Sequence, residues 1–378
     1  MKIGIDAHNL EHPGKTGPGV ARYLEGLLSQ WAGDIGKQHE FLLYFKDEIP
    51  KDLPKASQFK PLIVDRKGPR STALYYNVWL PSRAYRDKLD LLFLPLYMQP
   101  ISYLGKTAVT IHDISYRVHP EWFPMLRYQV PLRALTYWAI TRADVLLTVS
   151  EYSKSEIVSY YGVDQKKIHA IHLGVDQKFK QLPTARALIA KKYGINKHFL
   201  FYIGTIFNRR HVFETIKAFP RIADDLPQYQ LLISGRDHTN PAQHIDELIR
   251  TVNDISGREL VLRRDFIPEE DLVPLFNEAS LYVWPSTYEG FGLSPVEAMA
   301  CGCPVLSTNH TALKETVGDC GFLVKQPDDV AELANVLRTA LIDERKRTTL
   351  IKKGLQQAST FSWDRTAHET LQVFESIH

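Results

Sequence analysis

Short apolar runs alternate with amphipathic stretches along the first half of the chain. Two of these stretches, 20–31 and 128–141, carry apolar residues at helical spacing, and Ser150 precedes a capped helix start. The apolar runs have the length and composition of buried strands, and they are 3–6, 41–45, 91–94, 108–112, 145–149 and 169–172. This alternation predicts a parallel, doubly wound α/β sheet.

The pattern starts again after Gly174 and a polar stretch that ends near Pro183. The second series of predicted strands is 199–203, 229–233, 259–262, 281–284 and 305–307. The predicted helices between and after them are 212–219, 242–252, 269–278, 295–300 and 328–339. At 378 residues the chain exceeds what one core usually serves. We therefore expect domains at 1–175 and 176–362, a hinge around 174–182, and an amphipathic terminal segment at 363–378.

The stretch from Pro285 to Val305 carries two glutamates around a glycine turn. Glu289 is expected on the loop that leaves a strand, and Glu297 in the first turn of the next helix. In an open α/β sheet this edge binds ligands, and a Gly-x-Gly turn lets backbone N–H groups meet a polar ligand. A structural alternative is open, because Ser294-x-x-Glu297 also reads as a capping box with Pro295 at the first helical position.

Charge and cysteine content narrow the class of protein. The net charge is +3, with an excess of +5 over residues 1–175 and −2 over the rest. Three cysteines without a secretory leader argue against a disulfide framework, and Cys301-x-Cys303 lacks partners for a metal site. No apolar stretch is long enough to span a bilayer, so a cytoplasmic protein is expected.

Much of the positive charge falls in one segment with tyrosines and a tryptophan between the basic residues. This segment could rest on an anionic membrane, on the inner face, or meet an anionic acceptor, and a solvated loop is the alternative. Nucleic-acid binding is not expected, because no known motif accompanies the charge. The segment contains Lys51, Lys55, Lys60, Arg66, Lys67, Arg70, Arg83, Arg86 and Lys88, with Tyr75, Tyr76, Trp79 and Tyr85.

The run from Glu289 to Pro304, with Gly-Phe-Gly between the glutamates and Glu-Ala-Met-Ala-Cys-Gly-x-Pro after them, resembles retaining glycosyltransferase family 4. The resemblance covers nearly the whole chain and is strongest over 199–325. It implies the GT-B fold, with two Rossmann-like domains that face a deep cleft and a C-terminal helix that crosses back to the first domain. It also implies transfer of a hexose from a nucleoside diphosphate sugar to a saccharide or lipid-linked saccharide.

The resemblance assigns roles residue by residue. Arg209 and Arg210 would neutralise the leaving diphosphate, and Arg210 stands where the family usually has lysine. Glu289 would orient the sugar and Glu297 would bind the ribose. His112 would donate a hydrogen bond to a sugar hydroxyl or help orient the acceptor. Residues 265–272 would face the base. The remaining donor-binding residues would be Gly17, Gly19, Ser150, Gly204, Gly290, Phe291, Gly292 and Leu293.

The family commonly uses no metal and no cofactor besides the sugar nucleotide, and this chain lacks an Asp-x-Asp pair at a diphosphate site. GDP-mannose is the favoured donor and UDP-glucose the next. Two alternatives stay open: a GT-B sugar-nucleotide 2-epimerase, and a catalytically silent nucleotide-sugar-binding protein.

Overall fold

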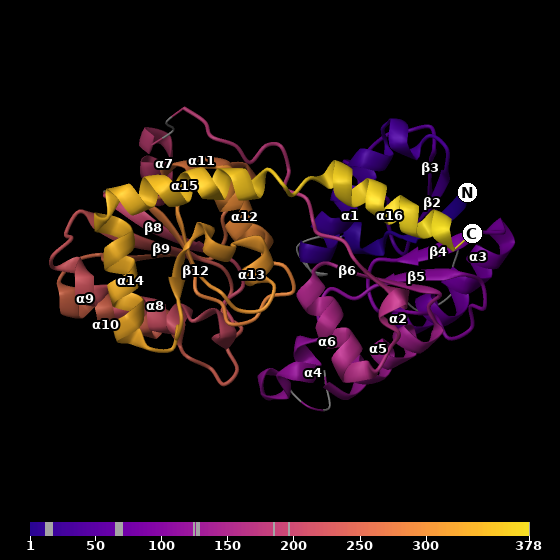
Figure 1. Ribbon diagram of the computed structural model, residues 1–378, viewed down its shortest axis with the longest axis horizontal. Coiled ribbons are helices and arrows are strands. Elements are labelled where there is room, and N and C mark those ends of the chain that lie inside the picture. The colour runs from indigo at the N-terminus through magenta and orange to yellow at the C-terminus, as the bar shows by residue number, and fades with distance from the viewer. Residues whose placement is uncertain are drawn as a thin grey trace. The chain divides into compact units, whose positions relative to one another are not determined.

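The computed structural model describes residues 1–11, 18–64, 71–123, 125, 129–183, 186–195 and 197–377. The chain forms two compact units, Met1–Gly174 with Ser362–His378 (unit 1) and Val175–Phe361 (unit 2) (Figure 1). Gly17, Arg66, Lys67 and Arg70, which were singled out in the sequence, lie outside the described residues.

Unit 1 is built on a parallel sheet with the strand order β3-β2-β1-β4-β5-β6-β7. Its strands are β1 (Lys2–Asp6), β2 (Glu40–Phe45), β3 (Phe59–Ile63), β4 (Leu91–Leu94), β5 (Thr107–Thr110), β6 (Val145–Thr148) and β7 (Ile168–Ala170). Its helices are α1 (Pro18–Trp31), α2 (Thr72–Leu74), α3 (Leu80–Asp87), α4 (Ser115–Val118), α5 (Val130–Arg142), α6 (Glu151–Tyr161) and α16 (Trp363–Ser376). Short turns are η1 (His8–Leu10), η2 (Asp34–Gly36), η4 (Pro120–Trp122), η6 (Gln165–Lys167) and the π-helical η3 (Tyr75–Trp79).

Unit 2 repeats this plan with the order β10-β9-β8-β11-β12-β13. Its strands are β8 (His198–Ile203), β9 (Tyr229–Ser234), β10 (Val261–Arg264), β11 (Leu281–Trp284), β12 (Val305–Thr308) and β13 (Phe322–Val324). Its helices are α7 (Arg186–Tyr193), α8 (Val212–Ala218), α9 (Pro220–Ala223), α10 (Ile245–Ser256), α11 (Leu272–Glu278), α12 (Leu293–Ala300), α13 (Leu313–Thr316), α14 (Val330–Ile342) and α15 (Glu344–Ala358). Single turns are η7 (Asn208–Arg210), η8 (Glu269–Asp271) and η9 (Gly318–Cys320).

The predicted fold class is confirmed, because both units are parallel, doubly wound sheets. In each unit the strand order reverses direction once: between β1 and β4 in unit 1, and between β8 and β11 in unit 2. Open α/β sheets bind ligands outside the carboxyl ends of the strands at such a reversal. The topology therefore marks one candidate ligand-binding edge in each unit.

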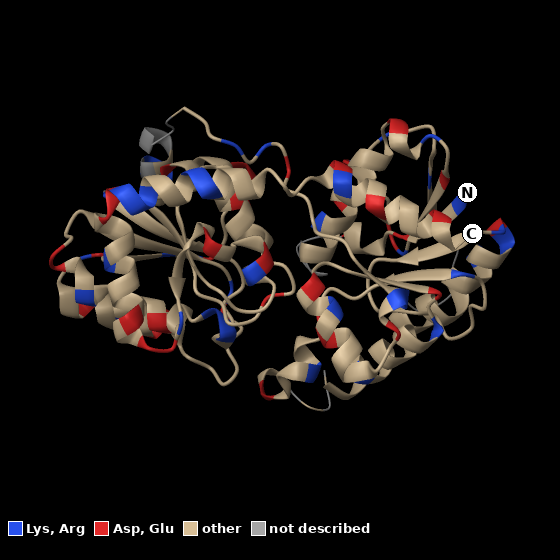
Figure 2. Ribbon diagram, viewed as in Figure 1, with Lys and Arg blue, Asp and Glu red and all other residues tan. Residues whose placement is uncertain are grey.

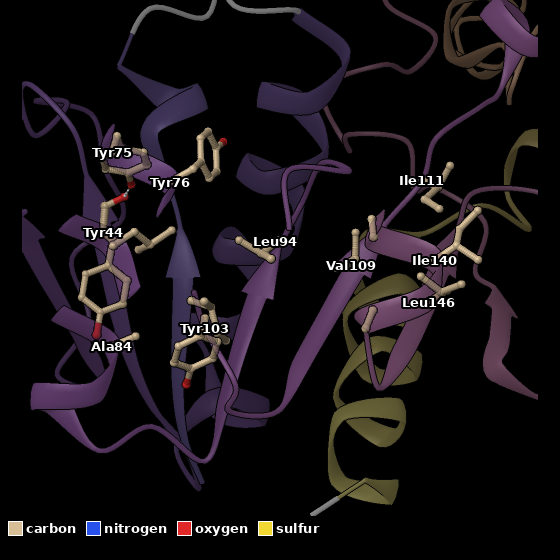
Figure 3. Packing of buried hydrophobic residues seen from close by; sticks show 14 of the residues in the cluster. Tyr44, Tyr75, Tyr76, Ala84, Leu94, Tyr103, Val109, Ile111, Ile140 and Leu146 are labelled. Atoms are coloured by element: carbon tan, nitrogen blue, oxygen red, sulfur yellow. Dashed lines mark hydrogen bonds between the residues drawn. The ribbon is translucent and has the colours of Figure 1, made fainter. Parts of the chain in front are cut away.

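Both faces of the unit 1 sheet are packed with apolar side chains. Leu92 and Leu94 on β4 point into a cluster with residues of α3, α5 and α6, part of which Figure 3 shows. Phe93, between them, lies on the opposite face and contacts Trp31 of α1 and Phe374 of α16, with ring centroids 6.4 Å and 5.0 Å away. The period-2 alternation of the strand thus places one core on each face.

Helix α16 is joined to unit 1 by close contacts with α1. The indole N–H of Trp31 donates to the carbonyl of Ala367 at 3.2 Å. A Cβ at Gly26 of α1 would lie 2.3 Å from the Trp363 ring, so the absence of a side chain there lets the two helices approach. The last helix of the chain is therefore part of the first unit's core.

The basic, aromatic segment of unit 1 differs from the sequence-based expectation. Tyr75 and Tyr76 were expected to face a membrane or an acceptor. They are instead buried, with 0% and 2% exposure, and cannot contact a membrane. Their hydroxyl groups instead bind the buried Asp6 carboxylate. Figure 2 shows basic and acidic residues interspersed on the ribbon of each unit. No helix among the described residues is long and apolar enough to cross a membrane.

Candidate active site

The candidate site of unit 2 is formed by the two loops that leave β8 and β11, the neighbouring strands at the reversal of strand order. The β8 loop carries Gly204, Arg209 and Arg210, and the β11 loop carries Glu289. The fold thus brings together the two arginines and the glutamate that the sequence singled out.

Gly204 is required by the close packing at the end of β8. Its φ is +143°, and a Cβ would lie 2.9 Å from the Trp284 ring and 3.1 Å from Nη1 of Arg210. Gly235, at the end of β9, has a φ of +133°, and its Cβ would lie 1.9 Å from the Gly204 carbonyl oxygen. Gly235 was not predicted from the sequence, although a lone glycine directly after a strand is a signal of close backbone approach.

Arg210 is held in a fixed position by three kinds of contact. Its Nε–H donates to Glu289 Oε1 at 3.0 Å, and Nη1 donates to the Thr205 carbonyl at 2.8 Å. The guanidinium lies 4.3 Å from the centroid of the Trp284 ring. Burial opposes the charge, but the Glu289 carboxylate and Tyr202 together outweigh burial and raise the pKa of Arg210. The pair is therefore a buried, charged anchor.

Arg209 is positioned by its backbone and by an aromatic ring. Its carbonyl accepts hydrogen bonds from the backbone N–H and the hydroxyl of Thr287, at 2.9 Å and 3.2 Å, which joins the β8 loop to the β11 loop. Its guanidinium lies 4.4 Å from the centroid of the Phe207 ring. Both arginines thus lie over aromatic rings in one small region.

The loop that carries Glu289 is tied to a strained residue on the next loop. The backbone N–H of Glu289 donates to the Thr311 hydroxyl at 3.1 Å. Thr311 has a φ of +50°, which is rare for a β-branched residue and costs about 1–3 kcal/mol. Strain of this kind concentrates at functional sites, and no sequence pattern indicated it.

The helix after Glu289 starts two residues earlier than the sequence predicted. Gly292, with a φ of +87°, is the N-cap, and α12 begins at Leu293. The capping-box alternative is therefore wrong, because Pro295 occupies the third helical position and Ser294 does not cap the helix. Glu297 lies in the second turn instead of the first, and is 3% exposed.

The turn before α12 is held in place by buried contacts. Phe291 is 4% exposed, and its carbonyl accepts a hydrogen bond from the Thr316 hydroxyl at 3.0 Å. Gly290 and Gly292 flank it in the same turn. The first N–H groups of a helix have no intrahelical partner and carry partial positive charge, which suits a phosphate oxygen.

Of the residues predicted for the site, three that the structure describes lie in unit 1. His112 follows β5, and its Nε2–H donates to the Pro95 carbonyl at 2.9 Å. Burial lowers its pKa below 6.5, so the ring is neutral near pH 7 and Nδ1 carries the lone pair. Ser150 is fully buried and caps α6 by accepting from the Ser153 N–H at 3.0 Å. Gly19 is exposed in the first turn of α1.

Other reactive groups in unit 2 are inert or occupied. Cys301, Cys303 and Cys320 are buried thiols, and burial raises the pKa of Cys301 to about 12. Among the described residues, no cluster of three or more His, Cys, Asp or Glu side chains could hold a metal ion. In the segment predicted to face the base, Asp271 pairs with Lys192, and Phe266 is 77% exposed.

Two family models match the chain, one on each unit. The model described as Glycosyltransferase Family 4 matches residues 19–179. The model described as Glycosyl transferases group 1 matches residues 186–357. O-antigen chain mannosyltransferase B of Escherichia coli is 30% identical, and the match covers 100% of each chain. The serotype-specific mannosyltransferase WbdA of Escherichia coli is 30% identical over 62% of this chain and 29% of its own length.

Solved structures match the chain over both units. Anabaena HepE, solved in complex with UDP and glucose, is 20% identical with a TM-score of 0.77, and the match covers 99% of each chain. Sucrose-phosphate synthase from Thermosynechococcus elongatus is 20% identical with a TM-score of 0.76, over 100% of this chain and 98% of that one. At this identity the likeness describes the fold alone.

Proposed function

This chain belongs to glycosyltransferase family 4 and has its GT-B fold, and we propose that it is a retaining hexosyltransferase. The donor we propose is GDP-mannose, with UDP-glucose next, and the acceptor is a saccharide or lipid-linked saccharide of a surface polysaccharide. The observation that carries the proposal is the Arg210–Glu289 pair, with its Nε to Oε1 distance of 3.0 Å, at the strand-order reversal of unit 2.

Mannose is favoured because a relative that matches the whole length of this chain is an O-antigen chain mannosyltransferase. A second relative, WbdA, is also a mannosyltransferase. UDP-glucose remains the second donor because HepE, which shares the fold, was solved with UDP-glucose as well.

The chemistry needs positive charge where a diphosphate leaves and oxygen acceptors where a sugar is held. Arg209 and Arg210 would neutralise the departing phosphates together with the N-terminus of α12. Glu289 would accept hydrogen bonds from sugar hydroxyls, and Glu297 from those of the ribose. Arg210 has five N–H donors, so it can retain its hydrogen bond to Glu289 and still donate another to a phosphate oxygen. Nδ1 of His112 would accept a hydrogen bond from a sugar hydroxyl.

The reaction we propose is a front-face displacement that retains the anomeric configuration. The bond from the anomeric carbon to the phosphate oxygen breaks while the acceptor oxygen bonds to the same face of the sugar. The leaving phosphate takes the proton of the acceptor hydroxyl. Two guanidinium groups stand in for a metal at the diphosphate, so transfer should persist in a chelator.

We also propose that unit 1 contacts an anionic membrane surface, where a lipid-linked acceptor would lie. Exposed apolar side chains support this proposal: Val78, Tyr85, Ile101 and Leu104 are 47–75% exposed. Basic residues of α3 and its C-cap, Arg86 and Lys88, are exposed in the same region.

The test incubates the purified protein with GDP-mannose or UDP-glucose, a mannose disaccharide labelled at its reducing end, and EDTA. The expected result is a trisaccharide formed from GDP-mannose. The NMR signal of its new anomeric proton should show that the new linkage has the same anomeric configuration as the mannose in the donor. Inversion would contradict the retaining proposal. Free epimerised sugar would support the epimerase, and nucleotide binding without transfer to any acceptor would support a silent binding protein.

A further inference from the structure

A buried carboxylate lies at the carboxyl end of β1 in unit 1. Asp6 is 1% exposed, and both of its oxygens are bound by side chains. Oδ1 accepts from the Tyr75 hydroxyl at 2.9 Å, and Oδ2 accepts from the Tyr76 hydroxyl at 2.8 Å. Oδ1 is also 2.8 Å from Nδ1 of His8. Burial of a charge is costly unless the charge is paired and hydrogen-bonded, and here it is both.

The two tyrosines that bind this carboxylate lie on an irregular helical turn. Tyr75 and Tyr76 are consecutive and open the π-helical turn η3, and their ring centroids are 5.2 Å apart (Figure 3). π-Helical turns are rare and occur frequently at functional sites. The Asp6 carboxylate thus accepts hydrogen bonds from two hydroxyl groups that this turn carries.

His8 is the member of this cluster that reaches solvent. Its side chain is 15% exposed, and its ring lies 5.6 Å from each tyrosine ring. Nδ1 donates to Asp6, while the structure gives Nε2 no partner among the described residues. Burial opposes protonation, but Asp6 and then Glu11 outweigh burial and the Lys46 charge and raise the pKa of His8 above 6.5. A protonated ring presents Nε2–H as a donor.

The position of the cluster in the fold points to a ligand. Asp6 is the last residue of β1, and the loop after β4 carries Pro95 and Gln99. Asp6 and this loop therefore flank the strand-order reversal of unit 1, which lies between β1 and β4. Gln99 is 5% exposed, and its Oε1 has no hydrogen-bond partner among the described residues. In unit 2 the same topological place holds Arg210 and Glu289. Apolar residues of similar volume are often at least as stabilising as a buried ion pair, so stability alone gives no reason for charged residues at this place.

We propose that the Nε2–H of His8 is the hydrogen-bond donor with which unit 1 binds a hydroxyl oxygen of the saccharide acceptor. Asp6, Tyr75 and Tyr76 are positioning residues that fix the ring and its proton. This inference rests on the proposed transfer to a saccharide, and it names a residue of the acceptor site that the sequence analysis did not identify.

The test compares two substitutions of His8 with GDP-mannose as donor and the labelled mannose disaccharide as acceptor. His8→Leu removes the donor, while His8→Gln places an amide N–H near the position of Nε2. Loss of a hydrogen bond from a charged group weakens binding by about 10- to 100-fold in the dissociation constant. We expect His8→Leu to raise the KM for the disaccharide by that factor, and His8→Gln to restore most of it. His368→Leu, an exposed site on α16, is the control.

A second readout does not depend on catalysis. The chain has 14 histidines, and the ring signal of His8 is identified in an NMR spectrum by its loss in His8→Gln. We expect this signal to shift when the disaccharide is added without donor. An unchanged acceptor KM in His8→Leu, or an unshifted His8 signal, overturns the inference. If the wild-type protein transfers no sugar from any donor, the proposed function fails, and the NMR titration alone decides on His8.

Discussion

At the residue scale, the candidate site depends on one buried charge pair. Arg210 and Glu289 have side chains that are 13% and 10% exposed, and each satisfies the other. Removing one partner of such a pair leaves an uncompensated buried charge. The same two residues are therefore expected to serve stability and chemistry together.

Glu289→Gln is expected to lower both stability and transfer. Loss of the partner of Arg210 should reduce the free energy of unfolding by about 3 kcal/mol. Loss of an anionic acceptor for the sugar should lower kcat by about 100-fold. Urea denaturation and donor turnover measure these two effects. The exposed control Glu344→Gln should change stability by less than about 0.5 kcal/mol, and equal behaviour of the two variants would refute the role of Glu289.

Asp6→Asn is expected to destabilise the protein by an amount that depends on pH. Burial opposes ionisation, but His8 and the hydrogen bonds outweigh it and lower the pKa of Asp6 below 3.8. That contribution is present above pH 3.8 and is lost as the pH falls through the lowered value. The raised pKa of His8 gives a contribution present below pH 6.5 and lost as the pH rises through the raised value.

The difference in unfolding free energy between wild type and Asp6→Asn should therefore be largest between pH 3.8 and 6.5. Urea denaturation at pH 5.5 and at pH 9 measures it. A difference of the same size at both pH values would show that the Asp6–His8 charge interaction does not contribute.

The sequence could not predict several residues that complete the two clusters. Glu289 was found because it follows a predicted strand, and Arg209 and Arg210 were assigned through the family resemblance. The strain at Thr311 and the contact between Gly204 and Gly235 depend on backbone angles and on loops distant in sequence. The two tyrosine partners of Asp6 are 69 and 70 residues away in the sequence, so no local pattern reveals them.

At the element scale, the sequence missed helices α3, α7 and α15, two edge strands and the start of one helix. Strands β3 and β13 were not predicted, and both lie at the edge of a sheet. β3 contains Pro61 and three exposed residues, so it lacks the apolar pattern of a central strand. β13 has only three residues. Helix α12 was predicted to start at Pro295 because a glycine N-cap gives no side-chain signal, whereas the serine cap of α6 was predicted correctly.

Gly26→Ala should destabilise the contact between α1 and α16. Alanine favours a helix by about 1 kcal/mol over glycine, but its Cβ would lie 2.3 Å from the Trp363 ring. Overpacking of this kind costs about 1–3 kcal/mol, so we expect a net loss of stability in urea denaturation. In a Trp363→Ala background the same change should become neutral or stabilising. An equal loss in both backgrounds would exclude the steric explanation.

At the scale of the whole molecule, one plan is used twice. Each unit places polar and charged side chains at the reversal of its strand order: arginines and a glutamate in unit 2, and an Asp–His–Tyr–Tyr cluster in unit 1. This arrangement suits an enzyme that binds a sugar nucleotide and a saccharide with different chemistry. The alternation of apolar runs predicted both sheets, because central parallel strands are apolar on both faces.

Calorimetric binding of GDP and UDP to the wild-type protein and to Arg209→Gln, in the presence of EDTA, is the decisive experiment for the proposed donor site. Arg209 is chosen because the variant leaves the Arg210–Glu289 pair intact, and Arg345→Gln, exposed on α15, is the control. We expect that GDP binds without metal, and that Arg209→Gln weakens binding about 10-fold or more while Arg345→Gln does not. Absence of binding by any nucleoside diphosphate, or equal binding by wild type and Arg209→Gln, would contradict the proposed donor site.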